Sequence, residues 1–275
     1  MIDKSGGSWG NGEERKDRRF GEEGGQLSYS SYLRLPELLA QQVPESSPAA
    51  HDELLFITVH QAYELWFKLL LYELDDARDG MLAGDTYRPR LRLQRAHVVE
   101  RLLVEQVDVL ETMTPQDFLR FRSNLAPASG FQSVQFRELE FLSGAKDARY
   151  VGRLRHATPH EQARLERRLA EPTLWDGFLV LLAKAGFEVS TVESRRSALV
   201  ALTGDRVEYG PLWDLAEALV EHDALCARWR QRHVLMVERQ IGTKSGTGGS
   251  TGAPYLRKRL DVRFYPELWE LRSWL

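Results

Sequence analysis

Apolar side chains recur at helical spacing in the first half of the chain. Within the segment that follows His51, aromatic and histidine side chains fall at steps of four, three and four, at Phe56, His60, Tyr63 and Phe67. This spacing places them on one face of a helix. Asp52 and Glu53 near the start of the segment suit a helix N-terminus, where negative charge is favoured. The pattern predicts a helix from residue 51 to about residue 76.

The next segment predicts a second long helix. Its apolar stripe steps mostly by seven and four residues, through Leu91, Val98, Leu102, Val109 and Met113. Similar patterns predict further helices near residues 132–142, 174–185, 212–238 and 266–275.

Three helix starts are marked by capping residues. Thr114, Thr158 and Thr173 each stand three residues before an acidic residue, and proline follows the first two of them. A threonine cap with an acid three residues later satisfies free backbone N–H groups, and proline fits the first helical position. Alternating strand patterns with hairpin turns are absent from the sequence. We therefore expect an all-α fold.

Two loops interrupt the helical pattern, at residues 126–130 and 242–252. Both are rich in glycine and small side chains, which is typical of a mobile lid or of a backbone that approaches a ligand closely. The second loop does not match a phosphate-binding P-loop, because no Gly-Lys-Ser/Thr ends it and a helix precedes it.

Composition narrows the function classes. The 275 residues carry a formal net charge of −3, which argues against nucleic acid or an anionic membrane as partner. Cys226 is the only cysteine, which excludes an internal disulfide, a thiolate zinc site and a cysteine-held iron–sulfur cluster. Residues 1–25 are rich in glycine and charge and lack a signal-peptide core, so we expect a disordered arm. Residues 26–275 would then form one domain of a soluble, cytoplasmic protein that does not span a membrane.

Among the seven histidines, His60 and His233 are candidates for chemistry because each lies within an apolar helical segment. We place the others on solvent-facing surfaces or, like His222, at helix ends. Hydrogen-bonded core histidines would explain both candidates equally well. His60 and Glu64 are also one helical turn apart and could chelate a metal, although no third ligand is evident nearby.

Arg122 is a candidate for binding a carboxylate. It lies one turn after Phe118 and beside the loop at 126–130. A planar guanidinium can grip a carboxylate through two hydrogen bonds, whereas the ordinary role of such an arginine is a surface ion pair. Core packing likewise explains Phe56, Tyr63 and Trp66 without any ligand.

Several sequence motifs, in order, resemble those of the tryptophan 2,3-dioxygenase family. They are YSSYLRL at 29–35, HDELLFI at 51–57, HQAYELWFK at 60–68, FR at 121–122 with PASGFQS at 127–133, and HVLMVERQIG at 233–242 followed by KSGTGGS at 244–250. The resemblance extends from about residue 27 to the C-terminal end of the sequence, in order and in approximate spacing.

This resemblance implies a helical protein that binds haem b. His233 matches the axial ligand of the iron, which leaves the opposite face open for O2. His60 matches the distal histidine, which contacts the indole N–H and acts in catalysis. Ser129 matches a residue near the haem edge.

The resemblance also implies how the substrate is held. Arg122 matches the residue that binds the substrate carboxylate, and Thr247 matches one that binds the amino-acid head group. Phe56 and Phe118 would form the walls of the indole pocket. Phe118 replaces a tyrosine found in some members, and Val59 a polar residue, changes that leave the expected substrate class intact.

Assembly follows from the resemblance as well. The family forms homotetramers, and Tyr29 and Tyr32 match a segment that completes the pocket of a neighbouring subunit. The glycine-rich loop at 242–252 can then close over bound substrate and exclude water.

The expected reaction inserts both atoms of O2 across the indole 2,3 bond of L-tryptophan and gives N-formyl-L-kynurenine, which belongs to tryptophan catabolism by the kynurenine pathway. A relative in specialised metabolism could instead insert one oxygen into tryptophan or a methylated tryptophan and give a 2-oxindole. A haem- or indole-binding sensor is a third reading, against which His60 and Arg122 together argue.

Overall fold

The computed structural model describes residues 27–154 and 157–275. By its internal contacts the chain divides into two units, residues 1–43 and 44–275. The described part of the first unit holds two short helices, α1 (Tyr29–Leu33) and α2 (Leu35–Leu39). The expected disordered arm at 1–25 lies outside the described residues, and the single domain over 26–275 stays a prediction.

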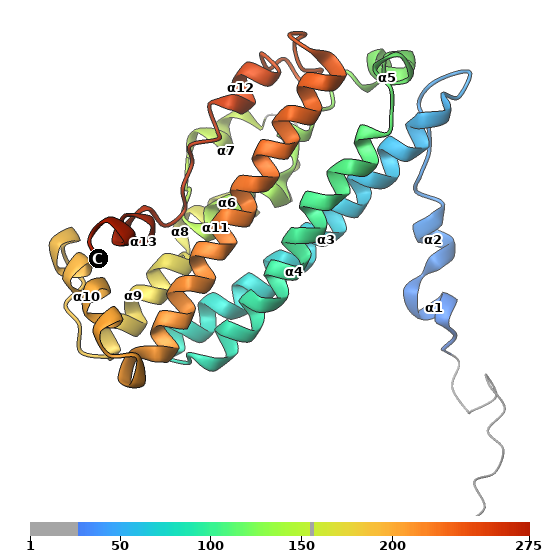
Figure 1. The fold of residues 1–275 in the computed structure, drawn as a ribbon. Coiled ribbons are helices and arrows are strands. Elements are labelled where there is room, and N and C mark those ends of the chain that lie inside the picture. The colour runs from blue at the N-terminus through green and yellow to red at the C-terminus, as the bar shows by residue number, and fades with distance from the viewer. Residues whose placement is uncertain (1–26, 155–156) are drawn as a thin grey trace, which may run out of the picture. The chain divides into compact units, whose positions relative to one another are not determined.

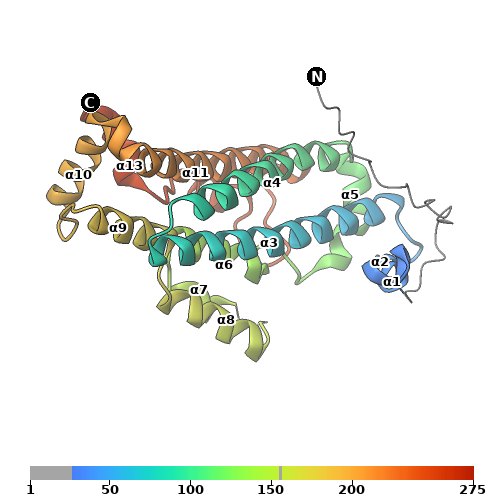
Figure 2. The same ribbon diagram turned by 90° about the horizontal axis from the view of Figure 1, so that it is seen from below.

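Three long helices form the frame of the second unit (Figures 1 and 2). They are α3 (His51–Ala83), α4 (Tyr87–Glu111) and α11 (Arg206–Ile241). A tight turn at Gly84, whose φ of 95° suits glycine, reverses the chain, so α4 runs antiparallel to α3. Hydrogen bonds from His97 to the Ala218 carbonyl and from Arg239 to Glu111 show that α11 runs in the same direction as α4.

The all-α prediction is confirmed for the part of the chain that the structure describes, which contains no strand. The remaining elements of the second unit are α5 (Pro115–Phe121), η1 (Arg122–Leu125), η2 (Gly130–Gln132), α6 (Val134–Ser143), α7 (Arg149–Arg153), α8 (Pro159–Ala170), α9 (Leu174–Lys184), α10 (Val192–Gly204), α12 (Ala253–Arg257), α13 (Pro266–Glu270) and η3 (Leu271–Ser273).

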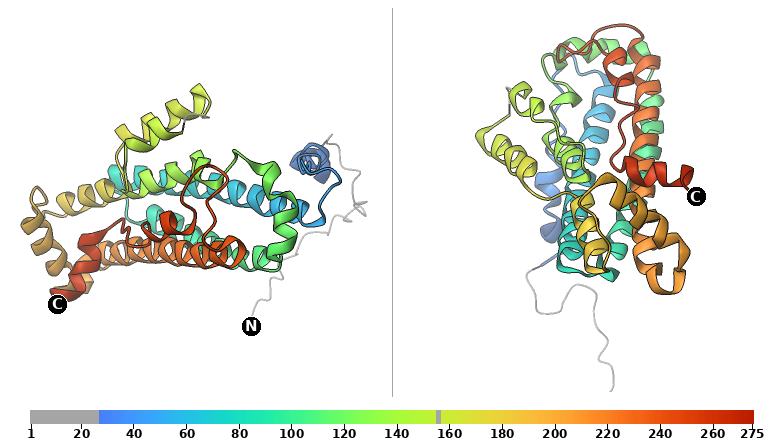
Figure 3. Two further views of the ribbon diagram at one scale, coloured as in Figure 1. Left: turned by 90° about the horizontal axis from the view of Figure 1, so that it is seen from above. Right: turned by 90° about the vertical axis from the view of Figure 1, so that its left-hand side faces the viewer.

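The main hydrophobic core lies where α9 and α11 pack against the α3–α4 hairpin. Leu74, Leu93, Phe178 and Leu215 are fully buried there. A smaller core forms where α7 and α8 stand out from the bundle beside α6 (Figure 3), around Phe141. Fully burying such a side chain stabilises the fold by about 1.5–3 kcal/mol.

Local sequence signals explain the helix starts. Thr114, Thr158 and Thr173 all cap their helices as predicted, each accepting a backbone N–H from the residue three positions on. The predicted start of α11 at residue 212 was wrong, because the helix begins six residues earlier and runs through Pro211. Asp205 caps that earlier start by accepting the N–H groups of Val207 and Glu208.

Helix α3 is long and apolar enough, by length and composition, to cross a membrane. Its apolar residues nevertheless pack against α4, α6 and α9, and Leu74 and Ala77 on it are completely buried. In the most apolar 18-residue stretch of α3, 28% of the residues are buried.

A buried carboxylate joins α11 to the C-terminal segment. Asp223 is fully buried, and its Oδ2 accepts the backbone N–H groups of Phe264 and Tyr265 at 2.8 and 3.3 Å and the indole N–H of Trp269 at 2.9 Å. Three donors on one oxygen offset much of the cost of burying the charge.

Candidate active site

The two histidines singled out from the sequence lie on facing helices. His60 comes from α3 and His233 from α11, and they are close enough for His60 to lower the pKa of His233 electrostatically. Sequence analysis placed each histidine in an apolar helix but could not bring them together, because α3 and α11 lie far apart along the chain.

Burial keeps His60 neutral, and its contacts set its tautomer. Its ring is stacked at a tilt on Phe56, with centroids 4.0 Å apart, and its Nδ1 lies 2.7 Å from the Phe56 carbonyl oxygen. Burial lowers the pKa of His60, although that carbonyl and Glu64 oppose the shift. Because a carbonyl only accepts, Nδ1 must carry the proton, and Nε2 remains an acceptor.

His233 has the chemistry of a metal ligand. Burial, and secondarily His60, lower its pKa to about 4, so the imidazole is neutral at physiological pH and its nitrogen lone pair is available. The ring stacks on Trp229 with centroids 5.1 Å apart and planes only 11° from parallel. Within the described residues the His233 side chain makes no hydrogen bond.

An aromatic cluster lies beside His60. The Phe56 ring lies 5.7 Å from that of Phe118 and 5.6 Å from that of Phe121, centroid to centroid. Both phenylalanines of α5 are buried, and they contact each other edge to face. Phe56 and Phe118 thus lie together, and Phe121 packs against both of them. Their part in an indole pocket stays a prediction.

The two loops predicted to approach a ligand meet each other. The Arg122 guanidinium, at the start of η1, donates to the Ser245 carbonyl, and the Thr247 hydroxyl donates to the Ala128 carbonyl at 2.6 Å. Arg122 is half-buried and has no acidic partner within the described residues, so it is not part of a surface ion pair.

Ser129 and Gly248 bring the two loops into close contact. A Cβ atom at position 248 would lie only 2.5 Å from the Cβ of Ser129. Only glycine permits this approach without displacement. Ser129 itself caps η2 by accepting the N–H of Phe131 and lies half-buried.

Tyr29 and Tyr32 belong to the first unit, on α1. Their side chains are strongly exposed, at 77% and 72%. Their predicted part in a neighbouring subunit's pocket is not tested by a single chain.

The alternative pairing of His60 with Glu64 finds no support. The Glu64 carboxylate accepts the side-chain N–H of Gln135 at 2.8 Å, and no third donor joins these two residues within the described part of the chain.

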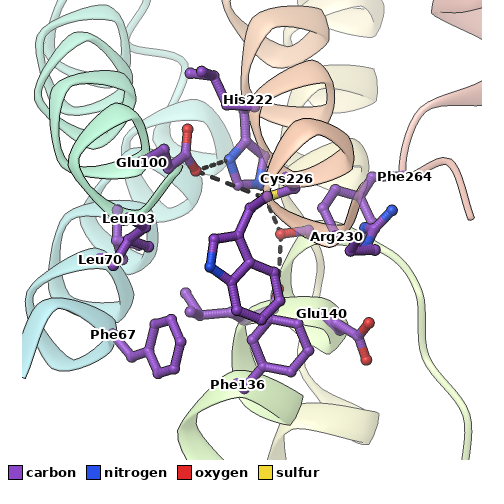
Figure 4. A pocket seen from close by; sticks show the side chains of 14 residues that line it. Phe67, Leu70, Glu100, Leu103, Phe136, Glu140, His222, Cys226, Arg230 and Phe264 are labelled. Atoms are coloured by element: carbon purple, nitrogen blue, oxygen red, sulfur yellow. Dashed lines mark hydrogen bonds and ion pairs between the residues drawn. The ribbon is translucent and has the colours of Figure 1, made fainter. Parts of the chain in front are cut away.

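A second polar cluster, which the sequence analysis missed, lies deeper in the bundle (Figure 4). His222 was expected at a helix end, but it lies inside α11 and is 1% exposed. Its Nδ1 bonds the buried carboxylate of Glu100, and its Nε2 lies 2.8 Å from the Ser143 hydroxyl. Cys226, one turn further along α11, donates its thiol to the same carboxylate at 3.9 Å. The one-turn spacing of His222 and Cys226 was the available signal.

This cluster borders a small cavity. Glu100 and His222 lie at one end and the rings of Phe67 and Phe136 at the other, with Trp229 also in its wall. Because Trp229 stacks on His233, the cavity reaches the neighbourhood of the candidate ligand. The ligand atoms of Glu100, His222 and Cys226 lie within 4.8 Å of one another, but their mutual hydrogen bonds already account for the arrangement.

Comparison with known proteins gives one consistent result. The family model described as tryptophan 2,3-dioxygenase matches residues 13–176 and 180–275. A protein named tryptophan 2,3-dioxygenase from Nocardioides sp. is 61% identical over 258 residues, which cover 92% of this chain and 97% of that protein. Proteins of the same name from Herpetosiphon aurantiacus and Myxococcus xanthus are 44% and 40% identical, and each match covers 90% of this chain and 98% and 90% of the relative.

Proposed function

The chain belongs to the tryptophan 2,3-dioxygenase family, and we propose that it inserts both atoms of O2 across the indole 2,3 bond of L-tryptophan to give N-formyl-L-kynurenine. The observation that carries this proposal is the facing pair of neutral histidines, His60 and His233, beside the arginine-bearing loop contact. The names of the relatives favour this reaction over the single insertion that gives a 2-oxindole.

The residues present suit haem b as the cofactor. His233 offers a neutral imidazole with no competing hydrogen bond in the described part of the chain, as an axial iron ligand requires. Aromatic side chains of Trp229, Phe136 and Tyr63 surround this region and suit a large flat apolar group. Haem, when bound, supplies the chemistry that binds and activates O2.

His60 would orient the indole ring. Since its Nδ1–H is directed to the Phe56 carbonyl, its Nε2 can accept the indole N–H. The depressed pKa keeps this acceptor neutral, and Phe56 and Phe118 provide apolar walls for the ring. Holding the substrate in one orientation lowers the entropic part of the barrier.

Arg122 and Thr247 would bind the amino-acid end of the substrate. Without substrate, each side chain bonds a backbone carbonyl of the opposite loop, at Ser245 and Ala128. A substrate carboxylate is a stronger acceptor for a guanidinium than a carbonyl is, because both partners are charged. Substrate binding would therefore replace these loop contacts, and the loop at 242–252, with Ser129 facing it, would close around the head group.

We further propose that the protein acts as a cytoplasmic homotetramer, with no nucleic-acid or membrane partner. The strong exposure of Tyr29 and Tyr32 supports a role in contacting another subunit, because burying exposed aromatic side chains against a partner stabilises the assembly.

The test is product analysis with labelled oxygen. The haem-reconstituted, reduced protein is given L-tryptophan under ¹⁸O2, and we expect N-formylkynurenine with two labelled atoms. A 2-oxindole with one label would overturn dioxygenation. His233→Ala should lose the absorption spectrum of histidine-ligated haem, whereas His160→Ala, a control histidine exposed on α8, should retain it.

A further inference from the structure

The two loops of the candidate site continue into one aromatic cluster. The loop at 126–130 leads directly into Phe131 of η2, and the loop at 242–252 is followed, three residues on, by Tyr255 of α12. The rings of Phe131 and Tyr255 meet edge to face, with centroids 5.7 Å apart. The residues that follow the two loops are therefore in contact with each other, as the loops themselves are.

Tyr150 of α7 completes this contact beside α12 (Figure 1). Its ring lies 5.7 Å from that of Phe131, centroid to centroid, and its hydroxyl lies 2.8 Å from the hydroxyl of Tyr255. Burial, and then the Tyr150 hydroxyl, raise the pKa of Tyr255 to about 12. The Tyr255 hydroxyl therefore keeps its proton at physiological pH, and the two hydroxyls share a hydrogen bond.

Arg137 of α6 lies against the same rings and is 5% exposed. Its guanidinium carbon is 4.1 Å from the centre of the Tyr150 ring and 5.5 Å from that of Phe131, distances at which a cation attracts an aromatic ring. Glu140 forms an ion pair with Arg137, which compensates the buried charge. We call Phe131, Arg137, Tyr150 and Tyr255 the loop cluster.

The loop at 242–252 is narrow where it joins α12. Gly252 has a φ of 70°, and a Cβ atom there would lie only 2.5 Å from the Lys244 carbonyl oxygen. The two ends of the loop therefore nearly touch, as in a compact Ω-loop. The direction of the tip, which carries Thr247, then depends on where these ends are held.

Ser129, in the other loop, is tied to the residues around Phe131. Its hydroxyl accepts the Phe131 N–H at 3.4 Å, and its own N–H donates to the side-chain oxygen of Gln132 at 3.2 Å. Gln132 in turn donates to the Pro127 carbonyl at 3.4 Å. A shift of Phe131 would therefore move Ser129 with it.

We propose that Tyr255 is a positioning residue for the amino-acid head group of the substrate. It holds the loop that carries Thr247 through the ring of Phe131 and the hydroxyl of Tyr150. Substrate would replace the contacts between the two loops, whereas the loop cluster would stay in place during that exchange. This inference rests on the proposed function and adds to it the residues that keep the two loops in register.

A cluster that served packing alone would stabilise the fold without any effect on the loops. Phe131 and Tyr150 do pack in the smaller hydrophobic core around Phe141. The Tyr255 hydroxyl separates the two roles, because Tyr255→Phe removes its hydrogen bond to Tyr150 and leaves the ring contact with Phe131 in place.

Hydrogen–deuterium exchange of the haem-reconstituted protein tests the positioning role. In Tyr255→Phe the amides of the loop at 242–252 should exchange about 3- to 10-fold faster, the factor expected from one lost hydrogen bond. Among them is the amide of Gly246, which donates to the Ser250 carbonyl at 3.0 Å. Exchange in α3 and α4 should hardly change. Tyr87→Phe, which removes the hydroxyl of a side chain that is 68% exposed, is the matched control and should leave loop exchange unchanged.

Three outcomes of this measurement would overturn the proposal. They are unchanged exchange in the loop, an equal increase in Tyr87→Phe, and an increase spread over α3 and α4, which would indicate general destabilisation. Exchange requires no turnover, so the result is independent of the proposed reaction, which product analysis of the parent protein tests separately.

Tyr150→Phe removes the other half of the same hydrogen bond, from a helix that carries no proposed substrate residue. It should speed exchange in the loop by a similar factor, and the double variant should add little, because one bond can be lost only once. Additive effects of the two substitutions would overturn the role of this bond.

Steady-state kinetics connect the loop to the substrate. Tyr255→Phe should raise KM for L-tryptophan about 3- to 10-fold with kcat and the haem spectrum nearly unchanged, because a displaced loop weakens binding of the head group. An unchanged KM, together with faster loop exchange, would overturn the positioning of substrate by Tyr255.

Discussion

The contact between Gly248 and Ser129 makes a sharp prediction about the two loops. In Gly248→Ala the new Cβ would meet the Ser129 Cβ at 2.5 Å and its Oγ at 3.1 Å. An ordinary contact between two such carbons is about 3.5–4.0 Å, so the loops must separate by about 1 Å. Neither atom is the end of a long flexible side chain, so the separation must come from the backbone.

That separation would break the bond next to it. The Thr247 hydroxyl lies 2.6 Å from the Ala128 carbonyl oxygen, and a displacement of this size takes it beyond hydrogen-bonding distance. Because substrate binding replaces this bond, its loss does not itself lower kcat/KM. Displacement of Thr247 would weaken the contact with the substrate head group by about the worth of one hydrogen bond, about 0.5–1.5 kcal/mol. We therefore predict a fall of roughly 2- to 13-fold in kcat/KM.

Steady-state kinetics with L-tryptophan measure this loss. The matched control is Gly246→Ala in the same loop, whose Cβ would meet only the Ser250 hydroxyl, at 2.6 Å, which can rotate away. The melting temperature should hardly change in either variant, because the loop lies outside the hydrophobic core. Equal kcat/KM in both variants would refute the reasoning.

Three further predictions concern single groups. Glu100→Ala leaves His222, which is 1% exposed, without its hydrogen-bond partner. The variant should lower the free energy of unfolding, measured in urea, by about 3–5 kcal/mol. A loss below about 1 kcal/mol would contradict the paired arrangement. Cys226 should react with iodoacetamide at pH 8 at least about 100-fold more slowly in the folded protein than in urea, because burial, and then Glu100, raise the pKa of its thiol. Since that folded-state pKa is raised, the thiol's contribution to stability is present below about pH 9 and is lost as the pH rises further, which pH-dependent unfolding can detect. Arg122→Lys keeps the positive charge but not the planar guanidinium, and should lower kcat/KM by roughly 10- to 100-fold with little change in melting temperature. Wild-type kinetics in this variant would show that the Arg122 guanidinium does not bind the substrate carboxylate.

The helix starts could be predicted from sequence because their causes are local. Each of the threonine caps at 114, 158 and 173 acts within four residues of chain. The early start of α11 escaped prediction because Pro211 usually marks a boundary. At the sixth position of α11 proline removes the backbone hydrogen bond to the Val207 carbonyl. The helix nevertheless continues on both sides of it, and Asp205 caps the earlier start.

The burial of individual side chains was harder to predict than the helix starts, because it depends on which helices become neighbours. His222 was placed at a helix end, yet Glu100 of α4 meets it inside the bundle. In the stripe that predicted α4, the residues from Leu91 to Val109 face outward, whereas Met113 lies beyond the end of the helix and is buried. A periodic pattern identifies a helix and one of its faces, whereas only the tertiary packing decides what that face contacts.

The candidate site likewise has one part that the sequence predicted and one part that only the structure shows. Residue type and helical context selected His60 and His233, and the family resemblance assigned their roles. The structure adds that they lie close enough to interact electrostatically and that the Phe56 carbonyl fixes the tautomer of His60. No sequence pattern carries that information, because it depends on a side-chain rotamer.

The buried carboxylate of Asp223 also bears on how the chain folds during synthesis. Its three donors come from residues 264, 265 and 269, some forty positions later in the sequence. Until the ribosome has released that segment, α11 would have to bury an unpaired charge to pack fully, which is costly. The middle of α11 should therefore stay hydrated in the nascent chain, and its tight packing should be one of the last steps of folding.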